Sequence, residues 1–333
     1  MNSIFLCERE SSFNSVYTEE MKQRLYEIAD APLKIYKKKD VLSSPSLFHD
    51  TRFIFSTWGM PRFETEEIKE CFPSLECVFY SAGSVQSFAL PFIECGVRVF
   101  SAWAANAVPV AEMTSSLILL SNKGFFAHAA AMKRRDLSSC SDYKSMYWGN
   151  YNEKVGLLGV GMIGSLVAKM LSDRDIKVLA FDPFLSEQKA SELGVVRCGI
   201  REVFSECRVV SNHLANNDRT RGMLDYGCFS LMRKGSTFIN TGRGAQVVED
   251  DLVRVLRERT DITAILDVTH PEPPMENHPF YSLPNCILTP HIAGSLGCET
   301  QRMASYMEEE FCRYLRGDEC KWEVSSQMLV TMA

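Results

Sequence analysis

The sequence lacks the marks of several common classes of protein. Its twelve cysteines are scattered and no two have C-x-x-C spacing, which argues against a zinc cluster, and we expect no metal site. Lysine and arginine number 36 against 42 aspartates and glutamates, and no block of basic residues stands out beyond KIYKKKD at residues 34–40. A surface that follows a nucleic-acid backbone is therefore not expected.

Long apolar runs are also missing. We find no run near the length of about 20 residues that spans a bilayer, and the opening stretch MNSIFLCERESS turns polar too early for a secretory signal. Unpaired cysteines at irregular spacing are typical of reduced thiols. We therefore expect a cytoplasmic protein with neither a membrane nor a nucleic acid as partner.

What the chain does contain indicates a folded protein of two α/β domains. Its 333 residues are 46% hydrophobic and 23% charged, a composition typical of soluble globular proteins of about two domains. From residue 154 onward, short apolar strands alternate with helical segments, and this alternation predicts a parallel sheet. The strands expected there are KVGLL, KVLAFD, RVVSN, STFIN, TAILDV and CILT.

The first part of the chain is less regular and predicts a second, smaller α/β lobe. RFIFST, CVFY and VRVFSA are expected strands, and FETEEIKECF is an expected helix. A long helical stretch from about Val110 to Met132 is predicted to separate the two lobes. The amphipathic helix in GCETQRMASYMEEEFCRYLRG follows the last strand, so we expect it to return to the first lobe.

The stretch LLGVGMIG predicts a dinucleotide site. Gly159, Gly161 and Gly164 have G-x-G-x-x-G spacing, follow a predicted strand and open a predicted helix, which is the context that the pattern requires. The first glycine permits a tight turn, the second lets a pyrophosphate approach the backbone, and the third lets helix and strand pack closely. The N–H groups at the start of the helix then face the phosphate charge.

Asp182 supplies the second half of that pattern. It ends the next strand, in VLAFDP, at about the spacing where a carboxylate hydrogen-bonds the ribose hydroxyls of NAD. The carboxylate would repel the additional phosphate of NADP. We therefore predict NAD as the cofactor.

Three further polar residues follow predicted strands. Arg243 lies in a Gly-Arg-Gly turn after STFIN, Glu272 lies in a proline-bounded loop after TAILDV, and His291 follows CILTP, where Pro290 stops strand pairing. Taken singly, each is compatible with a surface charge. Because the carboxyl ends of parallel strands meet at one edge of a sheet, we expect the three to gather there. A cationic fork, a proton donor and a carboxylate are what hydride transfer to a 2-keto acid requires.

The chain resembles the D-isomer-specific 2-hydroxyacid dehydrogenases, which include glyoxylate/hydroxypyruvate reductases and phosphoglycerate dehydrogenases. The motifs that carry the resemblance are VPVAE, GVGMIG…FDP, INTGRGAQVVEDDL and LDVTHPEPP…HPFYSLPNCILTPHIAG. It implies a Rossmann-type doubly wound parallel sheet in residues 118–296. It also implies a flavodoxin-like α/β substrate domain in residues 1–117 and 297–333, with a cleft between the two domains.

The resemblance also implies roles for single residues. Arg243 would bind the substrate carboxylate and carbonyl, His291 would donate the proton, and Glu272 would pair with His291. The backbone around Gly83 and Ser84 would help to hold the carboxylate. The residues expected to contact the cofactor, beside the three glycines and Asp182, are Met162, Ile163, His213, Leu214, Thr220, Thr241, Gly242, Gly294 and Asp267, the last of these at the nicotinamide amide.

Some positions depart from the family pattern. Relatives usually carry His-x-Pro where this chain has residues 213–215, and a second glycine where it has Val85. A Pro-Gly pair is frequent where it has Ala104 and Ala105. Trp58 resembles the reductases that act on small keto acids, although packing between elements explains it equally well. Arg62 is compatible with a substrate phosphate or, more simply, with the solvated surface.

Two functions are compatible with these patterns. The first is an NAD-dependent enzyme that interconverts a 2-keto acid and a D-2-hydroxy acid. The second is a non-catalytic, NADH-responsive binding protein, because the C-terminal-binding transcriptional corepressors share the fold and the triad. The segments MTSSLILL and YKSMYWGNY lie where the family forms a two-fold interface, so we expect a homodimer. The sequence leaves the keto acid and the preferred direction open.

Overall fold

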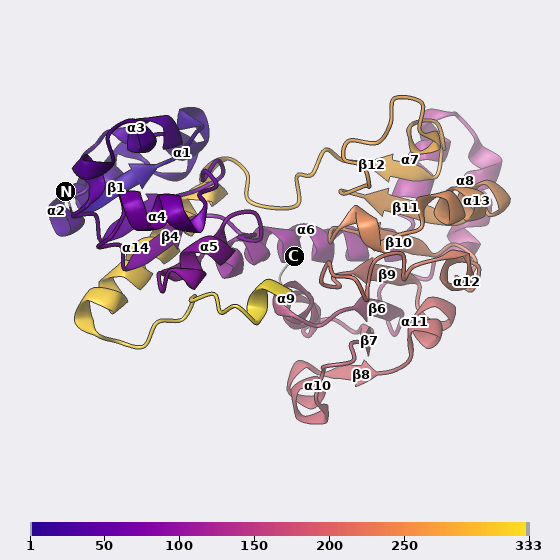
Figure 1. Ribbon diagram of the computed structural model, residues 1–333. Helices are drawn as coiled ribbons and strands as arrows, with labels where there is room; N and C mark the ends of the chain where they lie inside the picture. The colour runs from indigo at the N-terminus through magenta and orange to yellow at the C-terminus, as the bar shows by residue number, and fades with distance from the viewer. Residues whose placement is uncertain (1, 331–333) are drawn as a thin grey trace. The chain divides into compact units, whose positions relative to one another are not determined.

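The computed structural model describes residues 2–330 (Figure 1). The chain divides into two compact units, residues 2–106 with 295–330 and residues 107–294. The sequence prediction placed these divisions after residues 117 and 296. Residue 117 lies further along α6 (Trp103–Asn122), the helix through which the chain passes from one unit to the other.

The first unit is built on a five-stranded parallel sheet in the order β2-β1-β3-β4-β5. This is the flavodoxin-like strand order, and it confirms the predicted smaller α/β unit. The strands are β1 (Ser3–Leu6), β2 (Ile35–Tyr36), β3 (Phe53–Ser56), β4 (Cys77–Tyr80) and β5 (Arg98–Ser101). The helices are α1 (Glu10–Val16), α2 (Glu19–Ala29), α3 (Lys38–Ser43), α4 (Thr65–Cys71), α5 (Ala89–Glu94) and α14 (Thr300–Arg316).

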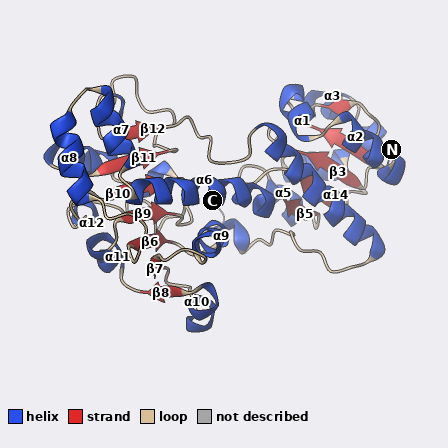
Figure 2. Ribbon diagram, turned by 180° about the vertical axis from the view of Figure 1, so that it is seen from behind, coloured by secondary structure: helices blue, strands red, loops and turns tan. Residues whose placement is uncertain are grey.

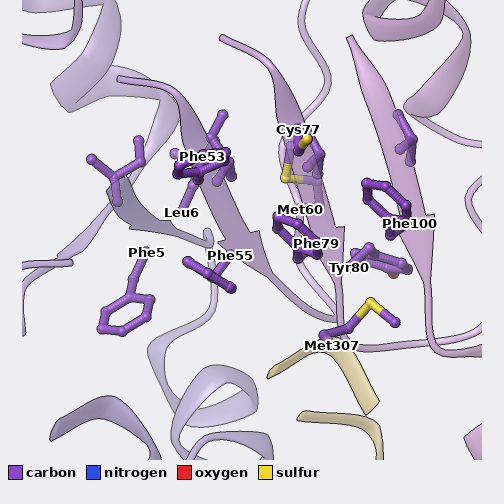
Figure 3. Close-up of a cluster of buried hydrophobic side chains, with 14 of the residues drawn as sticks. Phe5, Leu6, Phe53, Phe55, Met60, Cys77, Phe79, Tyr80, Phe100 and Met307 are labelled. Carbon is purple, nitrogen blue, oxygen red and sulfur yellow. The ribbon is translucent and has the colours of Figure 1, made fainter. Parts of the chain in front are cut away.

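Aromatic side chains fill the core of the first unit. Phe53, Phe55 and Phe79 project from neighbouring strands (Figure 3), and all three are buried. The ring of Phe311 on α14 lies 5.1, 5.2 and 5.4 Å from theirs. The helix that follows the last strand therefore returns to the first unit, as predicted, and covers one face of its sheet.

The second unit is built on a seven-stranded parallel sheet in the order β12-β11-β10-β9-β6-β7-β8 (Figure 2). The strand order reverses between β6 and β9, as in a doubly wound Rossmann sheet, so the predicted fold class is confirmed. The strands are β6 (Lys154–Leu158), β7 (Lys177–Phe181), β8 (Val195–Arg197), β9 (Val209–Asn212), β10 (Thr237–Asn240), β11 (Thr263–Leu266) and β12 (Cys286–Leu288). The helices are α7 (Phe125–Lys133), α8 (Leu137–Met146), α9 (Met162–Leu171), α10 (Glu187–Leu193), α11 (Ile200–Glu206), α12 (Tyr226–Phe229) and α13 (Glu249–Glu258).

The long helical stretch predicted from about Val110 to Met132 consists of two helices, α6 and α7. Gly124 separates α6 from α7 and adopts a left-handed conformation, with φ of 64°. A Cβ atom at this position would lie 2.3 Å from Cδ2 of Tyr147. The break therefore depends on a backbone conformation that favours glycine and on a close contact with a residue distant in sequence.

Helix α6 also corrects the statement about apolar runs. It is long and apolar enough to cross a membrane by length and composition alone, a test that core helices of soluble proteins also pass. More than half of its most apolar window is buried within the structure. Among its buried residues are the polar side chains of Thr114, Ser115, Ser121 and Asn122, which is compatible with a helix packed in a protein core.

The described cysteine side chains are free thiols. Burial raises the pKa of the Cys77 and Cys286 thiols to about 12, so both are protonated at neutral pH and make poor metal ligands. Within the described part of the chain, no three His, Cys, Asp or Glu side chains are arranged to hold a metal ion.

Candidate functional site

The residues of the second unit that were predicted to bind the cofactor or to take part in the reaction lie at one edge of its sheet. We call Arg243, Glu272 and His291 the chemistry residues. The glycine motif follows β6 and Asp182 follows β7, on one side of the reversal in strand order. Arg243, Glu272 and His291 follow β10, β11 and β12, which are neighbours in the sheet. This is the carboxyl edge, where open α/β sheets bind their ligands.

The glycine motif has the geometry that its spacing predicts. Gly159 has a φ of 86°, and a Cβ atom there would lie 2.6 Å from the carbonyl oxygen of His213. A Cβ atom on Gly164 would lie 2.2 Å from the carbonyl oxygen of Gly159. Apart from Gly161 itself and the residues adjoining it in the chain, no heavy atom lies within 4 Å of the corresponding position on Gly161. The turn is therefore closed toward the protein and open above Gly161, at the N-terminus of α9, where a pyrophosphate group fits.

Asp182 lies beside this turn. Its Oδ2 accepts a hydrogen bond of 2.8 Å from the backbone N–H of Val160, and its Oδ1 accepts one of 2.8 Å from Phe184. The carboxylate thus joins the end of β7 to the glycine turn. The contact of this carboxylate with a ribose hydroxyl stays a prediction.

His213 is a neutral residue at this edge. Its Nε2 lies 3.0 Å from Oγ of Ser211, and its Nδ1 is shielded from solvent without a hydrogen-bond partner. Burial lowers the pKa of His213 to about 4. The residue as a whole is only half-buried, but the shielded nitrogen supports the direction of the shift. At neutral pH this ring therefore offers a hydrogen bond and no positive charge.

Two threonines that were predicted to contact the cofactor have partners within the protein. The hydroxyl of Thr220 donates a hydrogen bond of 2.5 Å to the carbonyl oxygen of Ala215. The hydroxyls of Thr241 and Thr114 lie 3.1 Å apart. The remaining predicted residues also follow strand ends of this unit: Met162 and Ile163 open α9, Leu214 follows β9, Gly242 follows β10 and Gly294 follows β12.

His291 and Glu272 are joined by a short hydrogen bond. Nδ1 of His291 lies 2.6 Å from Oε1 of Glu272, and the two side chains are 47% and 40% exposed. His291 has a φ of 54°, an unusual conformation for a residue other than glycine that often marks functional positions. Because Nδ1 faces Glu272, Nε2 is the nitrogen left for a substrate.

Asp267 organises the loop that presents His291. Its buried carboxylate accepts hydrogen bonds from the hydroxyl of Thr289 at 2.6 Å and from the N–H groups of Ile292 and Ala293, both at 2.8 Å. Its carbonyl oxygen accepts a hydrogen bond of 3.1 Å from the N–H of His291. The contact with a nicotinamide amide stays a prediction, and the structure adds this internal role.

Arg243 is half-buried near Glu272. Burial lowers the pKa of its guanidinium, and the charge of Glu272 opposes that shift. Nη1 donates a hydrogen bond of 2.8 Å to the carbonyl oxygen of Gly242. A Cβ atom on Gly244 would lie 2.0 Å from the backbone of Thr269, so the Arg243 turn packs directly against the loop that leads to Glu272.

Sequence reasoning missed four residues that support this edge. Three are the buried amides of Asn212, Asn240 and Gln246, which bind one another and the neighbouring loops. The fourth is Glu249, which accepts a hydrogen bond of 2.7 Å from the N–H of His270 and whose pKa is raised by burial. The asparagines that end both VVSN and TFIN were a signal in the sequence.

Gly83 and Ser84 belong to the first unit, in the loop after β4. The hydroxyl of Ser101 donates to the carbonyl oxygens of Ala82 and Gly83, at 2.9 and 2.6 Å. This loop is therefore fixed by the end of β5. The predicted role of its backbone toward a carboxylate stays a prediction.

The two residues left open by the sequence also lie in the first unit. Trp58 is half-buried and packs against the core of that unit, which favours its structural interpretation. Arg62 is exposed, and its carbonyl oxygen accepts a hydrogen bond of 2.7 Å from Nζ of Lys38.

Comparison with known proteins decides the family. Residues 115–293 match the model described as "D-isomer specific 2-hydroxyacid dehydrogenase, NAD binding domain". The chain belongs to this family. The matched region contains the glycine motif, Asp182 and all three chemistry residues, and NAD is the cofactor of this domain.

Curated relatives match part of the chain. The Bacillus subtilis (strain 168) protein YoaD, assigned to the 2-hydroxyacid dehydrogenases, is 35% identical over 208 residues, 60% of this chain and 58% of that protein. The D-3-phosphoglycerate dehydrogenase of Methanocaldococcus jannaschii is 28% identical over 226 residues, 68% of this chain and 42% of that protein. The chain thus spans about half the length of these relatives.

A solved structure supports the fold over nearly the whole chain. The phosphoglycerate oxidoreductase from Rhizobium etli superposes with a TM-score of 0.78 at 21% identity, covering 98% of this chain and 99% of that one. At that identity the likeness concerns the fold alone, and it extends to both units.

Proposed function

We propose that this protein is an NAD-dependent oxidoreductase that interconverts a 2-keto acid and a D-2-hydroxy acid. The observation that carries the proposal is the arrangement at the carboxyl edge of the second unit. A histidine bonded to a carboxylate and a half-buried arginine follow three neighbouring strands, in the same sheet as the glycine turn. These are the groups that the reaction requires.

The residues of the NAD-binding domain suit their cofactor. The N-terminus of α9 and the open side of Gly161 would hold the pyrophosphate, and Asp182 would bind the adenosine ribose. When bound, NADH supplies the hydride that reduces the substrate carbonyl. The hydrogen bond that the N–H of Val160 in the glycine turn donates to Asp182 would hold these two contacts in a fixed relative position.

The chemistry residues would bind the substrate and transfer the proton. Arg243 would bind the substrate carboxylate with its planar fork and polarise the adjacent carbonyl. His291 would donate a proton from Nε2 to the carbonyl oxygen, and Glu272 would stabilise the imidazolium until that transfer. In the reverse direction the neutral ring would accept the hydroxyl proton.

Turnover tests this proposal and its alternative. The purified protein is mixed with NADH and, separately, with glyoxylate, hydroxypyruvate, phosphohydroxypyruvate and pyruvate, and NADH absorbance is followed. We expect at least one keto acid to be reduced, with the D enantiomer as the product where the product is chiral. Tight NADH binding without turnover of any of the four would favour the non-catalytic, NADH-responsive protein instead.

Asp182 is predicted to set the choice of cofactor. Its carboxylate would repel the 2′-phosphate of NADPH, so kcat/KM with NADH should exceed that with NADPH. Asp182→Ser removes the charge and should lower the ratio of kcat/KM with NADH to kcat/KM with NADPH. Steady-state kinetics with both cofactors provide the measurement. Faster turnover of NADPH by the wild type at equal concentration would contradict the prediction.

We also propose a homodimer that uses the surface of α6 to α8 and the following segment. This surface exposes apolar side chains at Leu120, Phe125, Met132, Leu137 and Trp148. Exposed apolar groups of this kind are typical of interfaces.

Trp148, which is 74% exposed, provides the test of the dimer. Trp148→Glu should weaken dimerisation by about tenfold or more in light scattering. Phe184→Glu changes another exposed aromatic residue elsewhere in the unit and should leave the dimer intact. A wild type that is monomeric at micromolar concentration would refute the proposal.

A further inference from the structure

Three amide side chains are buried together behind Arg243. Asn212 ends β9, Asn240 ends β10, and Gln246 follows three residues after Arg243. Each is at most 1% exposed. Burying an amide is unfavourable unless its donors and acceptors find partners, so the partners of these three show what the cluster does.

The amides first bind one another. Nδ2 of Asn212 donates hydrogen bonds to Oδ1 of Asn240 at 3.0 Å and to Oε1 of Gln246 at 2.5 Å. The cluster therefore links the ends of two neighbouring strands to the turn after the second strand. Each amide is held in one orientation, because exchange of its oxygen and nitrogen would place donors against donors.

Two of the amides bind both backbone groups of Arg243. Oε1 of Gln246 accepts a hydrogen bond of 3.3 Å from the N–H of Arg243. Nδ2 of Asn240 donates one of 3.1 Å to the carbonyl oxygen of Arg243. The position from which the guanidinium extends is thus fixed by side chains that water does not reach.

The same amides bind the loop after His213. Nε2 of Gln246 donates to the carbonyl oxygens of Leu214 and Ala215, at 2.6 and 3.0 Å. Oδ1 of Asn212 accepts a hydrogen bond of 3.3 Å from the N–H of Leu214. This loop adjoins the glycine turn, as the close approach of Gly159 to the backbone of His213 and Leu214 demonstrates.

We propose that Asn212 and Gln246 are positioning residues that couple the cofactor-side loop at residues 213–215 to the backbone of Arg243. The proposal rests on the function proposed above, in which Arg243 binds the keto acid. Apolar side chains of the same volume would fill the space but would leave several buried peptide groups without partners. The amide pair therefore lets a shift of the cofactor loop reach Arg243 through hydrogen bonds in a single arrangement.

Two variants remove the amides while keeping the volume, Gln246→Met and Asn212→Leu. We expect each to weaken NADH binding about tenfold and also to raise the KM for the keto acid about tenfold. Two variants are used so that, if one fails to fold, the other still tests the proposal. NADH affinity is measured by titration of the fluorescence of the full-length protein.

Asn285→Leu is the matched control. Asn285 is also a buried amide, and its Nδ2 donates to the carbonyl oxygens of Leu256, Arg259 and Ile262. It precedes β12 and so lies at the amino edge of the sheet, opposite Arg243. We expect it to lower the Tm as the other two variants do, while leaving NADH affinity and KM unchanged in the folded fraction.

A double-mutant cycle with Arg243→Lys separates positioning from a merely structural role. In the Gln246→Met background, the fold-decrease in kcat/KM caused by Arg243→Lys should be about ten times smaller than in the wild type. The reason is that the guanidinium fork is already displaced. In the Asn285→Leu background, Arg243→Lys should lower kcat/KM by the same factor as in the wild type. Additive effects in both backgrounds would overturn the proposal.

NADH affinity tests the proposed coupling even if the wild type shows no turnover. Unchanged affinity in Gln246→Met and Asn212→Leu would overturn the coupling whether or not the wild type reduces a keto acid. A wild type that binds NADH and reduces nothing would refute the proposed function alone, and weaker NADH binding by both variants would still support the contact between the amides and the cofactor loop.

Discussion

Replacing His291 is expected to lower kcat for keto-acid reduction about 10²–10⁴-fold, the usual effect of removing a positioned acid–base group. The variant is His291→Asn. Asparagine tolerates the left-handed backbone that His291 adopts, with φ of 54°, and it cannot supply the proton. The loss is therefore chemical, and the Tm should stay close to that of the wild type.

The geometry explains why the effect falls on kcat. Nδ1 of His291 is bonded to Glu272, so in the proposed function Nε2 would donate the proton as negative charge develops on the substrate oxygen. The negative charge that needs this proton develops in the transition state and is nearly absent from the bound substrate, so KM should change little. The measurement is steady-state reduction at saturating NADH.

His291→Ala provides a comparison. Alanine loses the same proton donor but fits the left-handed backbone less well, so it should be less stable and equally inactive. Calorimetric titration should find NADH binding unaffected in both variants. If His291→Asn kept more than a tenth of the wild-type kcat, another group would have to supply the proton and the assignment would be wrong.

The positions of the candidate site residues in the second unit could be predicted from the sequence because these residues lie in short local patterns. Gly159, Gly161 and Gly164 are fixed by a turn of six residues, and Asp182 by the end of the next strand. Arg243 was placed correctly at the sheet edge because it directly follows a strand. Such inferences need only the order of strands in a parallel sheet and not the packing between distant segments.

Elements whose formation depends on distant contacts were harder to predict. Strand β1 (Ser3–Leu6) is four residues long and lies in a stretch that soon turns polar, yet it is fully buried between β2 and β3. Edge strand β8 (Val195–Arg197) has three residues and one buried side chain, too few for a periodic pattern. The break at Gly124 stands between two apolar stretches that together resemble one helix.

The two strand-ending asparagines were visible in the sequence, but the burial and mutual contacts of the three amides could not be found from local pattern. An asparagine at the end of a strand is usually a turn residue exposed to water, and Gln246 in GAQVVED has the pattern of a surface residue. Only the pairing of β9 with β10 brings Asn212 and Asn240 together. Their role follows from contacts made across 28 and 34 residues of sequence.

Arg243→Lys is expected to lower kcat/KM for the keto acid about 10²–10³-fold, comparable with the loss of one donor to a developing oxyanion. A lysine keeps the charge, but its single ammonium cannot span the carboxylate and the carbonyl as a planar fork does. The side chain is half-buried, so water cannot fully replace the missing hydrogen bonds. KM should rise and kcat should fall, because in the proposed function the fork would contact the substrate before and during the reaction.

Arg259→Lys is the matched control for this change. Arg259 also forms a two-pronged pair, with Asp261 at 2.8 and 2.9 Å, but it precedes β11 and so lies at the opposite edge of the sheet. It should leave kcat/KM unchanged. NADH binding should survive in both variants, because the proposed phosphate site at Gly161 follows a different strand from Arg243. A variant Arg243→Lys that lost NADH and kept its turnover rate at saturating cofactor would assign the arginine to the cofactor and not to the keto acid.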